Sequence, residues 1–251
     1  MPLTFAHPAV VLPFSRNSSY INFSALVLGS MAPDFEYFLK GKPSAEIGHT
    51  YIGFITFNLP IVIIVYFLYK WFIHEVLNAN LPTILQIPAV HKKHSPKFVS
   101  WFVFLYSALF GMFTHVAWDS FTHAGGRIVR SFSLFTYQFS IFGVTIPLYK
   151  LFQHGSTLVG ICTIFLYMFF NARKNKRKNS VYPLKKWRYW MQIAVLSFIL
   201  FSLWIVLDRV SIHAYGILVV RMIDSALISL LIVSLFETYK QVPNVVRKSS
   251  H

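Results

Sequence analysis

The sequence predicts an all-α integral membrane protein, and two observations carry that prediction. Hydrophobic residues make up 55% of the 251-residue chain and charged residues only 12%, about half of the ~25% charged residues that soluble proteins carry. The apolar residues also gather in runs of roughly 20, the length that a helix needs to cross a bilayer. We therefore expect a single membrane domain over residues 1–251, built from helices because lipid offers no partner to exposed backbone groups.

Five segments are long and apolar enough to be predicted as transmembrane helices. They are Tyr51 to Phe72, Phe98 to Trp118, Thr157 to Phe170, Trp190 to Leu207 and Tyr215 to Phe236. The third is short unless it begins near Leu151, so its start stays open. Within this arrangement, residues 1–160 form the predicted helical core of a metal site, and residues 190–240 form a C-terminal helical pair.

One earlier segment, Ile21 to Leu39, is apolar in its first half and then becomes polar. Its second half carries Pro33, Asp34 and Glu36, which are unfavourable inside a membrane span. We expect a re-entrant or interfacial helix here, in addition to the five spans.

The excess of positive charge predicts how the chain is oriented. The net charge is +15, from 23 Lys and Arg against 8 Asp and Glu, which in a soluble chain would favour nucleic acid as a partner. Residues 173–189, between the third and fourth spans, are strongly basic, and such loops stay in the cytoplasm. Alternation from this loop puts the C-terminus and 15 of the 23 basic residues inside. The expected partners are membrane lipids rather than nucleic acid, and the oligomeric state stays open.

Seven histidines and aspartates then fall together on the outer side of the membrane. They precede the first span, end the second or begin the third, and they are His7, Asp34, His49, His115, Asp119, His123 and His154. The orientation was inferred from Lys and Arg alone, so their common side is an independent indication of a site there.

The sharpest local pattern is THVAWDSFTHAGG, in which His115, Asp119 and His123 recur every fourth residue. Residues four apart share one face of a helix, so His115 and Asp119 can chelate one ion. His123 would lie ~12 Å from His115 along a continuous helix, so it needs a second ion or a bend, for which Gly125 and Gly126 offer flexibility. The alternative is that both histidines are interfacial residues and that Asp119 bonds to the backbone.

The chemistry of the available ligands restricts the metal. Cys162 is the only cysteine and lies in an apolar run, so ligands are nitrogen and oxygen, which suit zinc, manganese or iron. Asp34 follows Pro33, which favours a turn that could direct its carboxylate into a shared site, although a simple helix cap is the alternative. His7, His49 and His154, taken singly, are equally consistent with interfacial hydrogen bonding.

The strings HPAVVLP, GSMAPDFEYF, GHT, THVAWDSFTH and QHGS together resemble a bacterial integral-membrane family of unknown function. The resemblance covers nearly the whole chain and is strongest over residues 1–160. More distantly, the order of motifs is similar to inner-membrane proteins assigned as metal-dependent hydrolases under SOS control, and to the zinc-dependent phospholipase C and single-strand nuclease superfamily. In that superfamily, an ordered series of His and Asp residues and a final Glu holds three metal ions that hydrolyse phosphate esters.

The resemblance implies a ligand set and a localisation for this chain. The implied ligands are His7, Asp34, His49, His115, Asp119, His123 and His154, with Asp119 bridging two ions. Leu158 stands where the superfamily has the final Glu, and no amino-terminal ligand is evident at Met1 and Pro2. Two divalent ions, with zinc favoured, are therefore expected rather than three. The implied location is a bacterial cytoplasmic membrane, with the metal site outside.

The sequence thus predicts a metal-dependent hydrolase of a phosphoester, with a lipid as one candidate substrate. Asp119 and Glu36 are the predicted catalytic residues, Glu36 as a neighbouring group or proton carrier. Arg127 and Arg130 could bind a phosphate bidentately, or could lie in a solvated loop. The alternatives are a non-catalytic membrane protein whose site binds metal for structure or transport, and a scaffold without metal.

The predicted orientation is testable with a reporter fused after Lys178, which is expected to read cytoplasmic because the adjoining loop is strongly basic. The matched control is a fusion after Arg209, between the last two spans, which should read on the opposite side. A reversed pair of readings would overturn the orientation.

Overall fold

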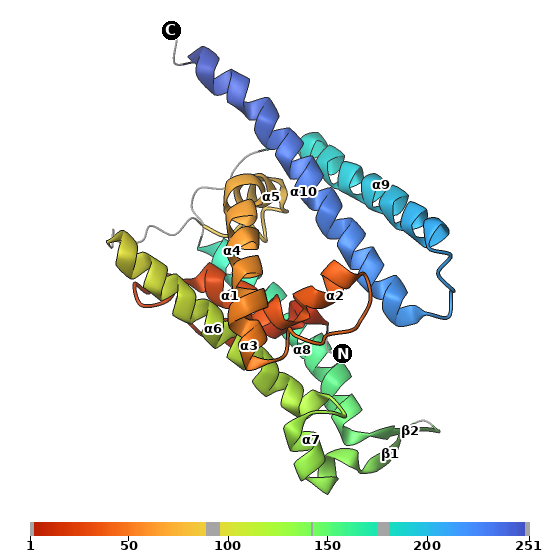
Figure 1. The fold of residues 1–251 in the computed structure, drawn as a ribbon. Coiled ribbons are helices and arrows are strands. Elements are labelled where there is room, and N and C mark those ends of the chain that lie inside the picture. Colours follow the sequence, from red (N-terminus) through yellow and green to blue (C-terminus); the bar gives the residue numbers. More distant parts are fainter. Residues whose placement is uncertain (1–2, 89–95, 142, 175–180, 249–251) are drawn as a thin grey trace. The chain divides into compact units, whose positions relative to one another are not determined.

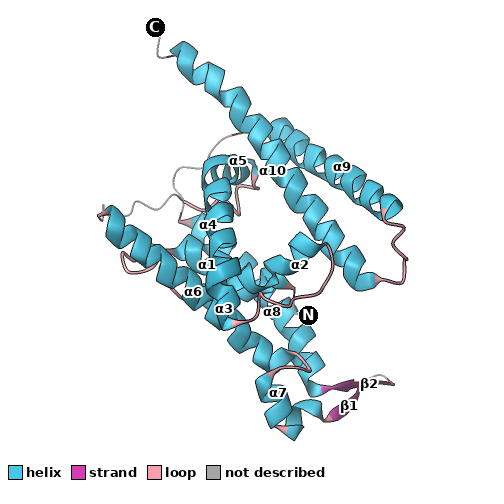
Figure 2. Ribbon diagram, in the orientation of Figure 1, coloured by secondary structure: helices cyan, strands magenta, loops and turns pink. Residues whose placement is uncertain are grey.

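The computed structural model describes residues 3–88, 96–141, 143–174 and 181–248, and helices make up most of them (Figure 2). The chain divides into two compact units. The first comprises residues 1–35, 46–63 and 89–170, and the second comprises residues 36–45, 64–88 and 171–251. The two units thus interleave along the chain, and the predicted metal-site core lies mainly in the first.

The described chain contains five helices long and apolar enough to cross a membrane, which confirms the five predicted spans. These helices are Tyr51–Asn80, Lys97–Ser131, Leu148–Arg173, Pro183–Leu207 and Tyr215–Lys240. Each extends beyond its predicted apolar run at one or both ends, because polar and aromatic residues continue the helix past the hydrocarbon layer. The third span begins at Leu148, so it has the length that its apolar run alone did not provide.

The amino-terminal region is helical but broken into short pieces. It contains a 3₁₀ helix, η1 (Thr4–Val11), then α1 (Phe23–Met31), the 3₁₀ turn η2 (Ala32–Asp34) and α2 (Phe35–Lys40). Asn22 caps α1 by accepting a hydrogen bond from the Ala25 N–H. Pro33 lies at the break after α1, where it cannot donate to a continuing helix. The predicted segment from Ile21 to Leu39 is therefore three consecutive helical pieces.

In the first unit, α1 lies along α6 (Lys97–Thr122), as Figure 1 shows. Two glycines allow the backbones of these helices to approach closely. A Cβ added at Gly29 would collide with the backbone of Ala108, and a Cβ at Gly111 would collide with the backbone at Leu26 and Ser30. Small residues at such crossings are typical of helices that pack in membranes. The contact fixes the end of α1, and the turn η2 that follows it, against the middle of α6.

The rest of the first unit follows α6 along the chain. A short helix α7 (Arg127–Ser131) and a 3₁₀ turn η5 (Ser133–Thr136) lead into strands β1 (Gln138–Ile141) and β2 (Val144–Pro147). The strands form an antiparallel hairpin in which Gln138 pairs with Pro147, and the sequence analysis did not anticipate it. Helix α8 (Leu148–Arg173) then returns to η1, where the Leu3 N–H donates to the Thr157 hydroxyl at 3.2 Å.

The span Tyr51–Asn80 is one long helix with two wider turns. Its pieces are α3 (Tyr51–Gly53), the π segment η3 (Phe54–Asn58), α4 (Leu59–Leu68), the π segment η4 (Tyr69–Ile73) and α5 (His74–Asn80). Pro60 lies two residues after the end of η3, and its missing N–H explains why the regular hydrogen-bond pattern is broken there. Thr50 caps the start, because its hydroxyl accepts from the Gly53 N–H at 3.0 Å.

In the second unit, α9 (Pro183–Leu207) and α10 (Tyr215–Lys248) lie side by side (Figure 1). They share an apolar core with α5, made by Val76, Tyr189, Ile193 and Val233. The Tyr189 hydroxyl lies 2.9 Å from that of Ser234, so its polar end is satisfied inside this core.

Arg221, within the last span, is neutralised by groups of its own unit. Its guanidinium lies 2.7 Å from the carboxylate of Asp208 and donates to the carbonyl oxygens of Gly41 and Trp204. The guanidinium also lies over the Trp204 ring, 4.9 Å from its centroid. This charged side chain is therefore fully engaged in holding the unit together.

We expect Gly29→Ala to destabilise the protein by about 1–3 kcal/mol, because the added methyl must displace backbone atoms of α6. The matched control is Gly155→Ala on α8, where an added Cβ meets no atom within 4 Å. Thermal unfolding of the two purified variants in one detergent measures the difference. Equal Tm values for the two variants would contradict the close approach of α1 and α6.

Candidate metal centre

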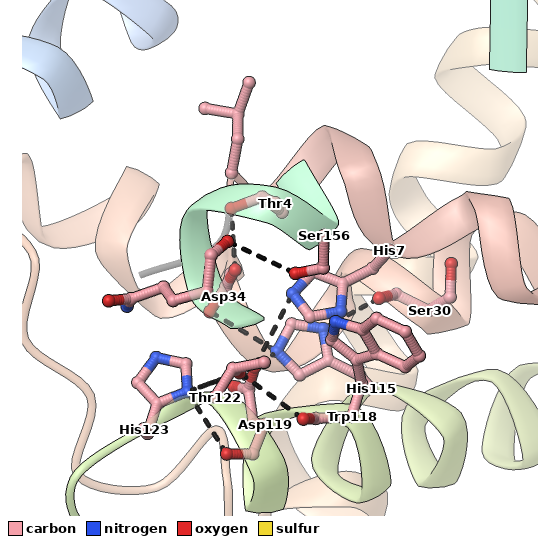
Figure 3. Close-up of polar contacts among 12 residues, drawn as sticks. Thr4, His7, Ser30, Asp34, His115, Trp118, Asp119, Thr122, His123 and Ser156 are labelled. Carbon is pink, nitrogen blue, oxygen red and sulfur yellow. Dashed lines mark hydrogen bonds and ion pairs between the residues drawn. The ribbon is translucent and has the colours of Figure 1, made fainter. Parts of the chain in front are cut away.

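Six of the seven predicted ligands lie together in the first unit, and the carboxylate of one of them, Asp119, is at their centre. They come from several elements. His7 lies on η1, Asp34 on η2, and both His115 and Asp119 on α6. His49 lies just before α3, and His123 directly follows α6. Figure 3 shows His7, Asp34, His115, Asp119 and His123 turned toward a common centre. Residues as far apart in sequence as His7 and Asp119 are thus brought together by folding.

The two oxygens of Asp119 face different pairs of imidazoles. Its Oδ2 lies 3.3 Å from His115 Nε2 and 3.4 Å from His49 Nε2. Its Oδ1 lies 3.3 Å from His123 Nδ1 and 3.7 Å from His7 Nε2. A carboxylate placed in this way can bind one ion through each oxygen, which is the geometry of a bridging ligand.

Asp34 joins the same set with one of its two oxygens. Its Oδ1 lies 3.5 Å from His115 Nε2 and 3.7 Å from His49 Nε2. Its Oδ2 accepts a hydrogen bond of 2.6 Å from the Thr4 hydroxyl. Thr4 therefore fixes the orientation of this carboxylate and leaves Oδ1 directed at the histidines.

The orientation of His115 is fixed by the backbone of α1. Its Nδ1 lies 2.7 Å from the carbonyl oxygen of Ser30, and a carbonyl can only accept, so Nδ1 carries the proton. In the neutral ring, Nε2 then has no proton, and its lone pair is directed at Asp34 and Asp119. A histidine whose second nitrogen donates to a carbonyl is the usual arrangement around protein-bound metals. The ring of His7 stacks on that of His115, with centroids 3.8 Å apart.

Two overlapping groups of these side chains could hold a metal ion. One consists of His7, Asp34 and His115, and the other of His49, His115 and Asp119, with candidate ligand atoms within 4.8 Å of one another in each. This ligand set of imidazole and carboxylate, without thiolate, suits a divalent transition metal.

Several buried atoms of the cluster have no hydrogen-bond partner among the described residues. They are both ring nitrogens of His7, Oδ1 of Asp34, Nε2 of His115 and Oδ1 of Asp119. Each such buried polar atom costs about 1–3 kcal/mol when it is left unsatisfied. Metal binding would satisfy one ring nitrogen of His7, Nε2 of His115 and the carboxylate oxygens, so the residues present fit a metal.

Two ligands outside the spans, His7 and Asp34, have the protonation states that a metal requires. Burial, with a smaller contribution from His115, lowers the pKa of His7 to about 3, so its ring is neutral at pH 7. Burial alone would raise the pKa of Asp34, but interactions with His115 and His7 and the hydrogen bond from Thr4 hold that pKa below its ordinary value. Neutral imidazole and ionised carboxylate are the forms that coordinate metals.

The cluster is closed on one side and accessible on the other. His115, Asp34 and His7 are at most 3% exposed. The side chains of His49 and His123 are 29% and 27% exposed. Catalytic metal sites keep such an open position, whereas structural sites are closed.

The end of α6 explains how His123 reaches the cluster. The sequence left open whether His123 needs a second ion or a bend, and the structure contains the bend. Helix α6 ends at Thr122, and His123 has extended backbone angles of φ −117° and ψ 141°. Its Nδ1 therefore stays close to Asp119, with the Asp119 backbone oxygen at 3.3 Å.

Four other predicted site residues lie elsewhere. His154 is exposed on α8 and, like His123, belongs to neither metal-binding group, and no ion pair among the described residues joins it to Asp119. Glu36 is buried and pairs with Lys40 in α2 at 2.7 Å, within the second unit. Arg127 and Arg130 are exposed on α7. Their proposed roles in catalysis and phosphate binding stay predictions.

Sequence reasoning missed the groups that hold the ligands in place. These include Thr4, the Ser30 carbonyl and Asn58, whose amide donates at 2.6 Å to the carbonyl of Gly48, next to His49. The spacing offered a signal for Thr4 alone, which lies three residues before His7. Such a spacing places residues on one helical face.

A family model described as a domain of unknown function, DUF4184, matches residues 1–235, which include the whole cluster around Asp119. No curated protein and no solved structure matches the chain.

The cluster is testable by its metal content. We expect His115→Ala and Asp119→Asn to lower metal affinity by about 10–100-fold or more. Each substitution removes a metal ligand that no neighbouring side chain can replace. The matched control is His154→Ala, which should retain the wild-type content because His154 is exposed. Elemental analysis of protein purified with metal present measures all three. Loss of metal from His154→Ala would show that this histidine is a ligand after all.

Proposed function

The chain belongs to the DUF4184 family, whose function is unknown, and from its His/Asp cluster we propose that it is a membrane-bound, metal-dependent phosphoester hydrolase. The observation that carries the proposal is the position of Asp119, each oxygen of which faces a different pair of histidines. Paired ions that share a carboxylate are a recurring arrangement in enzymes that cleave phosphate esters.

The proposed site holds two ions, with zinc favoured by the histidine-rich ligands. His49 and His115 lie near Oδ2 of Asp119 and also near Oδ1 of Asp34. His7 and His123 lie near Oδ1 of Asp119. A third ion is not proposed.

When bound, two divalent ions supply a hydroxide nucleophile at neutral pH and stabilise charge on the phosphoryl oxygens. Asp119 joins the two proposed ion positions, because one of its carboxylate oxygens belongs to each. Its carboxylate lies beside the ring of His115, which the Ser30 carbonyl holds in place. His49 and His123 form the accessible rim through which a substrate can enter. Arg127 and Arg130 are the proposed phosphate contacts of α7.

Two further considerations favour hydrolysis over a structural role for the metal. The rim is accessible, whereas a structural ion needs a closed shell. In addition, the order of His and Asp residues along the chain is similar to that of the zinc-dependent phospholipase C and nuclease superfamily, which acts on phosphate esters. The proposed location is a bacterial cytoplasmic membrane with the site on its outer face.

The proposal is tested by hydrolysis assays on purified protein reconstituted with zinc. We expect cleavage of bis(p-nitrophenyl) phosphate that a chelator abolishes and that Asp119→Asn lowers by about 10–100-fold or more. The matched control is His213→Ala, an exposed histidine in the second unit. Stoichiometric metal without hydrolysis of phosphodiesters, phosphomonoesters or phospholipids would establish the alternative, a metal site for structure or transport.

A further inference from the structure

A cavity of about 660 Å³ adjoins the metal centre within the first unit. Its walls come from η1, from Trp118 on α6 and from one face of α8. A cavity of this volume lies within the ~300–1,000 Å³ range of small-molecule sites in proteins. The cavity is therefore large enough to hold a ligand and is positioned beside the proposed reaction site.

The lining of the cavity is largely apolar. It includes Val10, Leu151, Phe152 and Val159, and His7 is the only ionisable side chain among its described lining residues. His7 also belongs to the metal-binding group with Asp34 and His115, so the cavity and the cluster share this residue. Both ring nitrogens of His7 are buried and have no hydrogen-bond partner among the described residues. A molecule in the cavity would thus have its apolar part along α8 and a polar part at the metal centre.

Helix α8 forms one wall of the cavity. Only 11% of its apolar span is buried, so most of this helix faces outward, as expected for a helix in contact with lipid. Leu158 and Phe165, for example, are 67% and 55% exposed. The cavity thus has as one wall a helix whose apolar surface is largely exposed.

Two glycines shape the wall that α8 contributes. Gly160 lets η1 approach closely, since a Cβ there would lie 2.9 Å from the Ala6 carbonyl oxygen. Gly155, five residues earlier on the same helix, also lines the cavity, but a Cβ there would meet no atom within 4 Å. Gly160 is therefore required for packing, whereas Gly155 leaves space that packing does not use.

From these features we propose that the cavity binds an acyl chain of a membrane phospholipid and places its phosphate at the metal centre. This inference rests on the proposed function and names the substrate class of the same site. A phospholipid has the layout of the cavity, an apolar chain joined to a phosphoester. In the reaction, a bond forms between the water oxygen and phosphorus, the bond from phosphorus to an alcohol oxygen breaks, and the proton of the water passes to that departing oxygen.

Chain binding is tested without reference to hydrolysis. The probe is a phosphatidylglycerol that carries a photoreactive diazirine at the end of one acyl chain, in vesicles that contain the purified protein. We expect crosslinks on η1 and on the cavity face of α8, and we expect Gly155→Leu to reduce them about tenfold, because its side chain occupies the free space. Cys162→Leu is the matched control, since Cys162 is exposed on the same helix and does not line the cavity.

A graded pair of substitutions at Gly155, together with the metal content, separates a loss of chain binding from a loss of folding. Gly155→Ala should give a smaller reduction than Gly155→Leu, and a wild-type metal content shows that the cluster of each variant is intact. Equal crosslinking in Gly155→Leu and Cys162→Leu, or crosslinks only on the outward face of α8, would overturn acyl-chain binding whether or not the protein hydrolyses anything.

A second measurement compares substrates. For Gly155→Leu, we expect the ratio of activity on long-chain phosphatidylglycerol to activity on bis(p-nitrophenyl) phosphate to fall about tenfold. An unchanged ratio would overturn the inference while leaving the proposed hydrolase intact. Wild-type protein that binds the chain but cleaves neither substrate would instead refute the proposed function alone.

Discussion

The close approach of α1 to α6 is the contact on which the rest of the site depends. Gly29 and Gly111 let the two backbones meet, and the Ser30 carbonyl thereby reaches Nδ1 of His115. That hydrogen bond fixes both the position and the tautomer of the most buried ring in the cluster. The same packing holds η2, and with it Asp34, opposite Nε2 of His115. A packing constraint between two helices thus determines the chemistry of the ligands that these helices carry.

The cluster is costly for the protein unless something binds it. Buried imidazoles and carboxylates face one another at 3.3–3.7 Å, and several of their atoms have no hydrogen-bond partner among the described residues. Removing such groups from water costs free energy that only hydrogen bonds, ion pairs or a metal can recover. The exposed rim at His49 and His123 makes the cluster more suitable for a reacting ligand than for a permanently enclosed ion. Metal binding would therefore both stabilise this region and supply its function.

Under the proposed function, the surroundings of the cluster restrict the class of substrate more than the metal ligands do. His7 belongs to both the cluster and the apolar cavity along α8, so the site has a polar and an apolar half. Most metal-dependent hydrolysis needs only the polar half. The apolar half, bounded by a helix that faces outward, is consistent with an amphipathic substrate that enters from the membrane.

The sequence by itself determined the five spans, because the bilayer requires a run of apolar residues that composition alone reveals. It also determined the pairing of His115 with Asp119, since four residues on a helix always share a face. Tertiary structure decided which distant residues join them. Packing brings His7 and His49 to Asp119, and Asp34 to His49. It leaves His154 exposed, although the sequence predicted all four residues as ligands. It also decided the bend at His123, the hairpin and the cavity at Gly155. These features depend on how closely backbones approach, and local periodicity contains no information about that distance.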